Sequence, residues 1–334
     1  MFFMKFLKFF FLFSILFSLA FLAFQNHANR KTIYFYTGFF GLEDKDQDIC
    51  FYGQNLSDIC REKGYTLKIT RSLDQKSLKN LYKLVIFDLE GVSRKKLRSY
   101  PQKRLVLFLW EPPSTVPKNY QSKYHRYFSK IYTWNDALVD NRKYFKFYYP
   151  ERRKMIANEN QKVFAEKKLL TMIARCKSSS HPDALYSKRE EAVQFFEGKE
   201  GFTLFGPAWD KKYKNYQGSI PSKEVLKDFR FSLCYENMQN ISGYVTEKIF
   251  DAFHFGSVPV YLGADNITKY VPKNCFIDRR KFRSLDELNS YLRNMKEEEY
   301  QLYLENIETF LKSKKTNFFS PEYFALMFQK ALFE

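Results

Sequence analysis

Cysteine is scarce and unpatterned in this chain. Its 334 residues include five cysteines and no Cys-x-x-Cys pair, so a structural zinc site is not indicated and a dense disulfide framework is excluded. Cys50 and Cys60 are the candidate pair if the domain is lumenal, whereas Cys234 lies in an apolar strand and is expected to be a buried thiol. Cysteine usage therefore leaves the redox compartment open.

The sequence also lacks long blocks of basic residues, internal repeats and low-complexity tracts. The net charge is +18, yet lysines and arginines occur in twos and threes, as at 94–96, 152–154 and 279–281. Because a nucleic-acid arm needs longer basic blocks, no nucleic-acid partner is expected. The 19% of aromatic residues keep a basic nucleic-acid or phospholipid binder open as an alternative, although no recognition motif supports it. A basic surface equally suits a small anionic ligand or an anionic membrane, or reflects a compositional habit.

The first 30 residues form a separate segment. An uncharged apolar run extends from Phe9 to Phe24, and the phenylalanines from Phe2 onward bring it into the range of ~17–25 residues that crosses a bilayer. Small residues in and after the run lack the spacing that a signal peptidase prefers. We expect residues 1–30 to be an uncleaved signal anchor in a single-pass membrane protein, with a removed signal peptide as the alternative.

The rest of the chain alternates predicted strands with predicted helices. The first set has helical stretches at 47–63 and 74–82 and strands at Thr32 to Thr37, Thr66 to Thr70, Leu84 to Asp88, Leu105 to Trp110 and Ile131 to Trp134. The second set has helices at 184–196 and 246–255 and strands at Leu169 to Ala174, Phe202 to Phe205, Phe231 to Tyr235 and Val258 to Leu262. This alternation predicts an α/β fold class with two largely parallel sheets.

A charged, weakly apolar stretch at 151–168 separates the two sets and is the predicted linker. We therefore place an N-terminal α/β domain at 31–155 and a C-terminal α/β domain with closing helices at 156–334. Residues from 284 onward are expected to be helical, with the last of them packing back onto the body of the protein.

The most informative stretch runs from Phe229 to Gly263. An apolar strand leads into a polar loop, a helix opens at Thr246, and Gly256 closes that helix ahead of a second strand. In such a unit, free backbone N–H groups and the helix dipole favour anionic ligands such as phosphate. Lys248 lies in the first helical turn, where the dipole disfavours a cation, so it suggests a nearby anion. A solvated surface lysine is the alternative.

Three motifs in this stretch read Glu-Asn at 236–237, Gly-Tyr-Val-Thr-Glu-Lys-Ile at 243–249 and Gly-Ser-Val-Pro-Val-Tyr-Leu-Gly at 256–263. Their combination resembles the signature of family 10 glycosyltransferases, the α-1,3/1,4-fucosyltransferases. The similarity extends upstream through 204–209 and Gly218 to Lys223, and downstream through 271–274 and 276–278. The resemblance covers roughly the second half of the chain. It implies a GT-B architecture of two Rossmann-like domains that face a cleft, with an acceptor-side domain at 31–155 and a donor-side domain at 156–334.

The resemblance also implies an inverting fucosyltransferase. Its substrates would be GDP-β-L-fucose and a hydroxyl of an N-acetylglucosamine- or glucose-containing glycan, joined in α-1,3 or α-1,4 linkage. The membrane would be that of the Golgi in a eukaryotic source, with the catalytic part lumenal. Two alternatives stay open: a transferase of another nucleotide sugar, and an inactive membrane-anchored glycan-binding protein, because a fold does not prove activity.

Glu111 is the candidate general base. Inverting transfer needs a carboxylate to take the proton of the acceptor hydroxyl and cations to neutralise the departing diphosphate. Glu111 follows the strand Leu105 to Trp110 and precedes two prolines, at the carboxyl end of a strand where α/β folds place their sites. Position alone favours a solvated loop glutamate, and the Glu-Pro-Pro context, which resembles the family, favours the base.

Arg189 and Lys248 are the candidate cations. The family carries a diphosphate-binding arginine at the start of the corresponding helix, and arginine suits a bidentate grip on phosphate, although neighbouring Lys188 leaves a one-residue ambiguity. The family's Ser-Asn pair before this helix is absent, because residues 174–176 read Ala-Arg-Cys. This departure questions the geometry of the loop and leaves the donor class unchanged.

Three further residues resemble donor-binding positions of the family. Glu247 corresponds to the acid that binds the ribose hydroxyls, with a helix-dipole role as an equal alternative, and Asn237 and Tyr244 correspond to contacts of the donor loop. Glu236, either a contact near the nucleobase or a loop brace, and Lys223 are possible additional residues.

No metal or other cofactor is expected. The stretch at 44–48 reads Asp-Lys-Asp-Gln-Asp and offers an Asp-x-Asp, with which metal-dependent glycosyltransferases hold a divalent ion. It also resembles the start of an EF-hand, but Ile49 stands where glycine is needed. We interpret it as the acidic start of a helix, so side-chain cations are expected to replace a metal.

Overall fold

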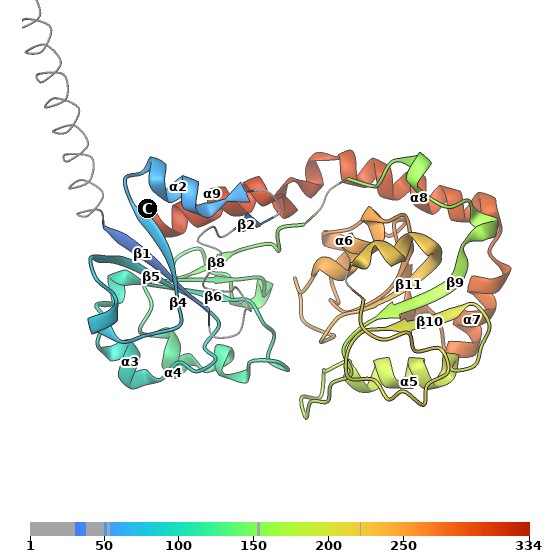
Figure 1. The fold of residues 1–334 in the computed structure, drawn as a ribbon, viewed down its shortest axis with the longest axis horizontal. Helices are drawn as coiled ribbons and strands as arrows, with labels where there is room; N and C mark the ends of the chain where they lie inside the picture. Colours follow the sequence, from blue (N-terminus) through green and yellow to red (C-terminus); the bar gives the residue numbers. More distant parts are fainter. Residues whose placement is uncertain (1–30, 38–49, 52–53, 152–153, 221) are drawn as a thin grey trace, which may run out of the picture.

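The structure is a computed structural model that describes residues 31–37, 50–51, 54–151, 154–220 and 222–334. Figure 1 shows two α/β lobes side by side, each built on its own twisted sheet. We call them the N-terminal lobe, which contains strands β1 to β8, and the C-terminal lobe, which contains strands β9 to β13. The predicted α/β fold class is therefore confirmed.

The N-terminal lobe has a parallel sheet with the strand order β4-β1-β5-β6-β7-β8. Every residue of β6 is buried, as expected of a parallel strand that is covered on both faces. The short strands β2 and β3 pair separately in an antiparallel hairpin. The strands are β1 Thr32–Thr37, β2 Cys50–Phe51, β3 Gln54–Asn55, β4 Thr66–Thr70, β5 Leu81–Phe87, β6 Leu105–Leu109, β7 Lys130–Thr133 and β8 Tyr144–Lys146, and the helices are α2 Leu56–Glu62, α3 Arg94–Arg98 and α4 Ser122–His125.

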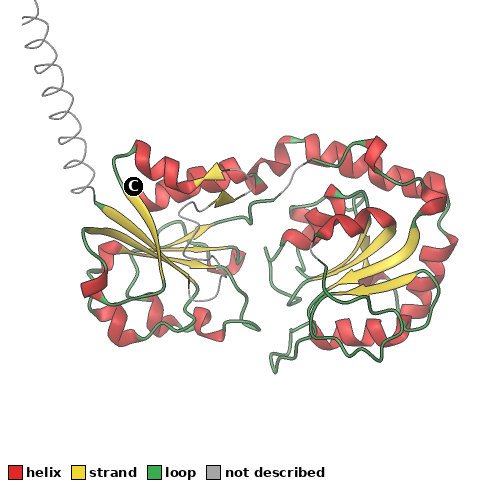
Figure 2. Ribbon diagram, in the orientation of Figure 1, coloured by secondary structure: helices red, strands yellow, loops and turns green. Residues whose placement is uncertain are grey.

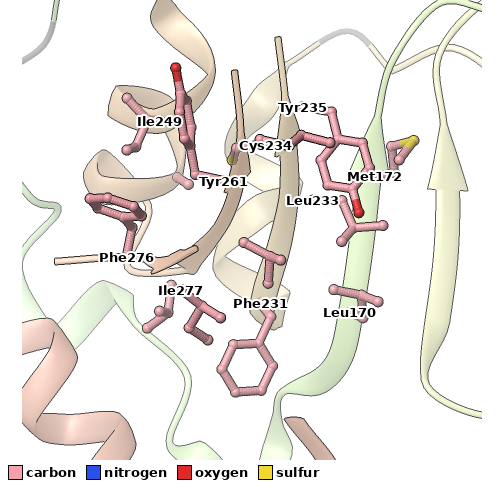
Figure 3. Close-up of a cluster of buried hydrophobic side chains, with 14 of the residues drawn as sticks. Leu170, Met172, Phe231, Leu233, Cys234, Tyr235, Ile249, Tyr261, Phe276 and Ile277 are labelled. Atoms are coloured by element: carbon pink, nitrogen blue, oxygen red, sulfur yellow. The ribbon is translucent and has the colours of Figure 1, made fainter. Parts of the chain in front are cut away.

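The C-terminal lobe has a second parallel sheet with the order β10-β9-β11-β12-β13. Figure 3 shows its core, in which Phe231 and Leu233 of β11 lie beside Leu170 of β9. The strands are β9 Lys168–Ile173, β10 Phe202–Phe205, β11 Phe229–Tyr235, β12 Val258–Leu262 and β13 Ile277–Asp278, and the helices are α5 Tyr186–Phe196, α6 Glu247–His254, α7 Leu285–Asn294 and α8 Glu297–Lys312.

The last helix, α9 Pro321–Phe333, returns to the N-terminal lobe. Ser320 caps it by accepting a hydrogen bond from the N–H of Tyr323 at 3.0 Å. The ring of Phe328 then packs 6.2 Å from Phe108 and 6.4 Å from Phe35, measured between ring centroids. Figure 2 shows the row of helices that α8 and α9 form across both lobes. Two chain segments therefore connect the lobes, one between β8 and β9 and one between α8 and α9.

The predicted strands are all present, whereas the predicted helix at 74–82 is wrong and the one predicted at 47–63 is confirmed only in its second half. Residues 74–82 contain a single 3-10 turn at Gln75–Ser77, and β5 begins already at Leu81, because it pairs there with Thr32 of β1. In the stretch 47–63, the helix among the described residues is Leu56–Glu62, since β2 and β3 pair ahead of it. Polarity and length favour helices in both stretches, and pairing with neighbouring strands overrides that local preference.

Among the residues that the structure describes, none of the helices has the length and apolar character needed to cross a membrane. The predicted signal anchor at 1–30 and the Asp-x-Asp at 44–48 lie outside the described residues. The predicted domain division after residue 155 falls between β8 and β9 and stays a prediction.

The described cysteine thiols are free. Cys60, Cys234 and Cys275 are buried, and Cys176 is half-buried. Burial raises the pKa of the Cys234 thiol to about 12, so it is a neutral core residue. The side chain of Cys50, the other member of the candidate pair, lies outside the described part of the chain.

Candidate active site

The strand-loop-helix-strand unit at 229–263 is built around the carboxylate of Glu236. This residue follows β11 directly and is fully buried. One carboxylate oxygen accepts a hydrogen bond from the N–H of Thr246 at 2.9 Å, and the other accepts one from the Thr246 hydroxyl at 2.7 Å. Because Thr246 directly precedes α6, Glu236 ties the start of the helix to the end of the strand. This geometry is that of a loop brace.

Lys248 lies between carboxylates at the start of α6. Its ammonium group is 3.1 Å from Glu236 and 3.1 Å from Glu247, and it donates to the hydroxyl of Thr246 at 2.9 Å. Burial disfavours the charged lysine, but Glu236 and Glu247 outweigh it and raise the pKa of Lys248 above its ordinary value. Two carboxylates therefore stabilise the cation at a helix end where the dipole opposes it.

Glu247 and Lys223 extend this cluster of charges. Burial alone would raise the pKa of Glu247, but Lys248 and Lys223 outweigh it and lower the pKa to about 2. Lys223 forms an ion pair with Asp251 on α6. The Glu247 side chain keeps 39% of its surface exposed, so an ionised carboxylate remains available to a ligand.

Arg189 is 4% exposed and is held by the end of β11. Its Nη2 donates to the carbonyl of Tyr235 at 2.7 Å and to the side-chain oxygen of Asn237 at 2.9 Å. Its Nε is buried and has no hydrogen-bond partner among the described residues. A small cavity of about 30 Å³ at the carboxyl ends of β9 and β11 is lined by four charged side chains, namely Arg189, Lys223, Lys248 and Asp251.

Glu111 belongs to the other lobe and lies just beyond the end of β6. Burial raises the pKa of Glu111, while the charge of Lys248 lowers it and the charge of Glu247 raises it. Nearby, the hydroxyls of Thr115 and of Tyr186 on α5 lie 3.3 Å apart, which brings the two lobes into contact. Glu111, the predicted base, and Lys248, the predicted cation at the start of α6, therefore interact electrostatically across the boundary between the lobes.

Tyr244 and Asn237 have structural partners in this fold. Tyr244 is 2% exposed, and its ring packs 4.4 Å from that of Trp134 in the N-terminal lobe. The side-chain oxygen of Asn237 is bound to Arg189. Both residues therefore shape the loop between β11 and α6, Tyr244 by packing against the other lobe and Asn237 by orienting an arginine.

A polar cluster fastens the lobes beside this loop. The carboxylate of Asp136 accepts hydrogen bonds from Lys146 at 2.7 Å, Asn266 at 2.8 Å and Tyr270 at 2.6 Å. Gly243 packs against the cluster with a φ of 87°, and a Cβ at this position would collide with Lys146 and Asp136. The glycine of the motif at 243–249 is thus required by contact with the N-terminal lobe.

Sequence reasoning missed four residues of this region. Asp88 and Asn119 hold the backbone at Glu111, and Asp136 joins the lobes. Lys177, on the loop after β9, lowers the pKa of Glu111 through its charge. Of these four residues, only Asp88 could have been predicted from the sequence. It is an acidic residue at the end of a predicted strand, a position close to that of Glu111, which directly follows one.

The C-terminal lobe is similar in sequence to known proteins. Residues 163–325 match the family profile described as "Glycosyltransferase family 10 (fucosyltransferase) C-term". An α-(1,4)-fucosyltransferase of Arabidopsis thaliana is 41% identical over 71 residues, which are 21% of this chain and 18% of that protein. The chain thus spans less than a fifth of the length of this relative.

Solved structures share the fold over most of the chain. An α1,3-fucosyltransferase crystallised with GDP-fucose has a TM-score of 0.54 at 15% identity and covers 91% of both chains. Anabaena Alr3699/HepE in complex with UDP and glucose has a TM-score of 0.56 at 10% identity, over 91% of this chain and 99% of that one. The two sheets and the charged site between them therefore define a GT-B glycosyltransferase fold. Over residues 163–325, just under half of the chain, the sequence is similar to glycosyltransferase family 10.

The sequence contains three glycosylation sequons, at Asn55, Asn240 and Asn266, and the last two lie beside this site. Asn240 is exposed and donates to Asp183 at 3.0 Å, whereas Asn266 is half-buried and bonded to Asp136. In a host that glycosylates sequons, we expect the active protein to carry little glycan at Asn240, because a bulky glycan on the donor loop is incompatible with ligand binding. Glycopeptide mass spectrometry measures the occupancy, and full occupancy in active protein would contradict the placement of the loop.

Proposed function

We propose that this protein is an inverting fucosyltransferase. It transfers L-fucose from GDP-β-L-fucose to a hydroxyl of an N-acetylglucosamine- or glucose-containing glycan, in α-1,3 or α-1,4 linkage. One observation carries the proposal. Glu111 has a half-buried carboxylate with a raised pKa, and this carboxylate interacts electrostatically with Lys248 and Glu247 of the other lobe. A base and a cationic donor site thus face each other, as group transfer from a diphosphate requires.

In the proposed step, the Glu111 carboxylate takes the proton of the acceptor hydroxyl. The acceptor oxygen forms a bond to the anomeric carbon of fucose while the bond from that carbon to the diphosphate oxygen breaks. The electron pair of the broken bond leaves with GDP, and the configuration inverts because attack and departure occur on opposite faces. The raised pKa of Glu111 strengthens it as a proton acceptor.

The cations on the C-terminal lobe would stabilise the departing diphosphate. Lys248 remains charged because its pKa is raised, and Arg189 keeps a buried Nε without a partner among the described residues. Charged hydrogen bonds from such groups to phosphate oxygens are stronger than neutral ones. Glu247, ionised and partly exposed, would accept hydrogen bonds from the ribose hydroxyls.

The proposal also includes attachment to a membrane. The apolar run from Phe9 to Phe24 supports a single-pass signal anchor, with the catalytic lobes on its carboxyl side. In a eukaryotic source this would be a Golgi enzyme that faces the lumen. Protease protection of the lobes in sealed vesicles tests this orientation.

A donor panel tests the proposed reaction. Full-length protein in detergent is incubated with GDP-fucose, GDP-mannose, UDP-galactose and UDP-glucose, each with galactose- and N-acetylglucosamine-containing acceptors. We expect turnover with GDP-fucose. Turnover with a UDP-sugar alone would instead favour a transferase of another nucleotide sugar, and binding of glycans without any turnover would favour the inactive binding protein.

We expect EDTA to leave most of the activity. Within the described residues, no group of three or more histidine, cysteine, aspartate or glutamate side chains is placed to hold a metal ion. Lys248 and Arg189 would supply the positive charge that a metal supplies elsewhere. The measurement is the initial rate with and without EDTA, and complete loss that manganese restores would point to the acidic stretch at 44–48.

A further inference from the structure

A buried aspartate grips the main chain at the proposed base. Asp88 directly follows β5 and is completely buried. Its Oδ1 accepts hydrogen bonds from the N–H of Trp110 at 2.8 Å, the N–H of Glu111 at 3.0 Å and the side-chain amide of Asn119 at 2.5 Å. The adjacent strands β5 and β6 end side by side, which is why an acid after one strand reaches the backbone after the other.

Asn119 completes this clamp. Its amide nitrogen also donates to the carbonyl of Glu111 at 3.2 Å, and its oxygen accepts from the N–H of Leu89 at 2.8 Å. The hydroxyl of Tyr120 donates to the same Glu111 carbonyl at 3.2 Å. Both polar groups of the Glu111 backbone are therefore fixed, so its side chain starts from a defined position.

The backbone of Asp88 is itself unusual. Its φ is 61°, in the left-handed region that residues other than glycine rarely adopt. Such a conformation persists only where the surroundings hold it, and it occurs preferentially at functional sites. A buried, left-handed aspartate that binds the N–H of Glu111 directly, and the Glu111 carbonyl through Asn119, points to a role at Glu111.

We propose that Asp88 is a positioning residue for Glu111, which fixes the Glu111 main chain and strengthens Glu111 as a base through its negative charge. The inference rests on the proposed function of Glu111, because it concerns the same site.

The charges around the pair define how the effect depends on pH. Burial raises the pKa of Asp88 to about 7, the charge of Glu111 adds to this, and the hydrogen bonds from Glu111, Asn119 and Trp110 oppose it. Coupling between two acids is reciprocal, so ionisation of Asp88 must raise the proton affinity of Glu111. Among the described residues, the titratable or charged side chains that act on the two carboxyl groups are Tyr120, Tyr149, Lys177, Tyr244, Glu247 and Lys248.

Two substitutions separate the clamp from the charge. Asp88→Ala removes both, and we expect kcat to fall on the order of 10²-fold with the KM for GDP-fucose nearly unchanged, because a misplaced base loses about this much. Asp88→Asn keeps an acceptor oxygen and loses the charge. We expect it to lose less than about tenfold in kcat, the lower end of what acid–base effects contribute. It should also lose the step near pH 7 in the pH profile of kcat.

The matched control is Asp140 in the same lobe. Its Oδ1 also accepts from three backbone N–H groups, those of Arg142, Lys143 and Tyr144, but it is exposed and does not contact Glu111. Asp140→Ala should leave kcat and the pH profile unchanged. If Asp88→Ala keeps kcat within threefold of the unsubstituted protein, or if Asp88→Asn retains the step near pH 7, the inference is overturned.

A measurement without turnover distinguishes this inference from the proposed function. If the unsubstituted protein transfers no fucose, the proposed function fails, yet the coupling is still visible in the carboxyl ¹³C resonance of Glu111 during a pH titration. We expect this resonance to shift a second time near pH 7 in the unsubstituted protein and in Asp140→Asn, and not in Asp88→Asn. A second shift that persists in Asp88→Asn overturns the inference, as does its absence from the unsubstituted protein. GDP binding by calorimetry confirms in each variant that the C-terminal lobe is folded.

Discussion

Replacing Glu111 by glutamine should reduce turnover by about 10² to 10⁴-fold, the contribution typical of general base catalysis. Glutamine keeps the shape of the side chain but does not accept the proton of the acceptor hydroxyl. Affinity for GDP-fucose should stay nearly intact, because the proposed donor-binding side chains belong to the C-terminal lobe. The measurement is kcat and the dissociation constant of GDP-fucose for the folded variant.

Glu90→Gln is a suitable control for this substitution, since Glu90 is an exposed glutamate in the same lobe. It should behave as the unsubstituted protein does. A folded Glu111→Gln protein that retains more than about a tenth of normal turnover would send the search for the base to another carboxylate. A lower melting temperature with broadly poorer binding would instead indicate a structural role for Glu111.

The pH dependence of the unsubstituted protein follows from the same residue. A general base acts in its ionised form, and burial raises the pKa of Glu111 above that of an ordinary glutamate. We therefore expect kcat/KM to fall as the pH decreases through this raised pKa, at a higher pH than an exposed glutamate would give. The acidic limb should be absent from the residual activity of Glu111→Gln.

Replacing Arg189 or Lys248 by alanine should weaken the use of GDP-fucose by one to several kcal/mol, on the order of a lost charged hydrogen bond. The two substitutions differ in their effect on stability. Lys248→Ala leaves the fully buried Glu236 without its cation, so we expect the melting temperature to fall as well. Arg189→Lys retains a charge but loses the planar guanidinium group, whose Nη2 donates to both Tyr235 and Asn237, so it should recover little of the donor use.

Lys227→Ala provides the control for these cations. Lys227 pairs with Glu224 at 2.6 Å on the surface of the same lobe, and neither residue lines the charged cavity. Its substitution should change neither the kinetics nor the melting temperature. Unchanged kinetics with GDP-fucose in both Arg189→Ala and Lys248→Ala would show that the donor diphosphate binds elsewhere.

Local sequence patterns predicted most of the scaffold because the relevant signals are local. Apolar runs bounded by polar residues located the strands, and Thr246 and Gly256 bracketed α6. The failures occurred where pairing partners decide the outcome. In the polar stretch at 74–82, pairing with Thr32 of β1 draws the last residues into a strand.

The site residues divide in the same way. The sequence predicted Glu111 as a base because it follows a strand at its carboxyl end, and Lys248 as a cation because it lies in the first turn of a helix, where an anion would stabilise it. Their mutual influence depends on two lobes that meet only in the folded chain. For Tyr244, the motif suggests a donor contact, which stays a prediction, and the tertiary structure adds packing of its ring against Trp134 of the other lobe.

By itself, the sequence determined the class of fold, the family resemblance and the charged side chains near strand and helix ends, because spacing and motif are properties of short segments. The tertiary structure alone decided which of these charges compensate one another. Glu236 became a brace and Asp88 a clamp through hydrogen bonds to residues 10 and 23 positions away. Contacts of this kind depend on which strands lie side by side, and sheet order is fixed only when distant parts of the chain pack together.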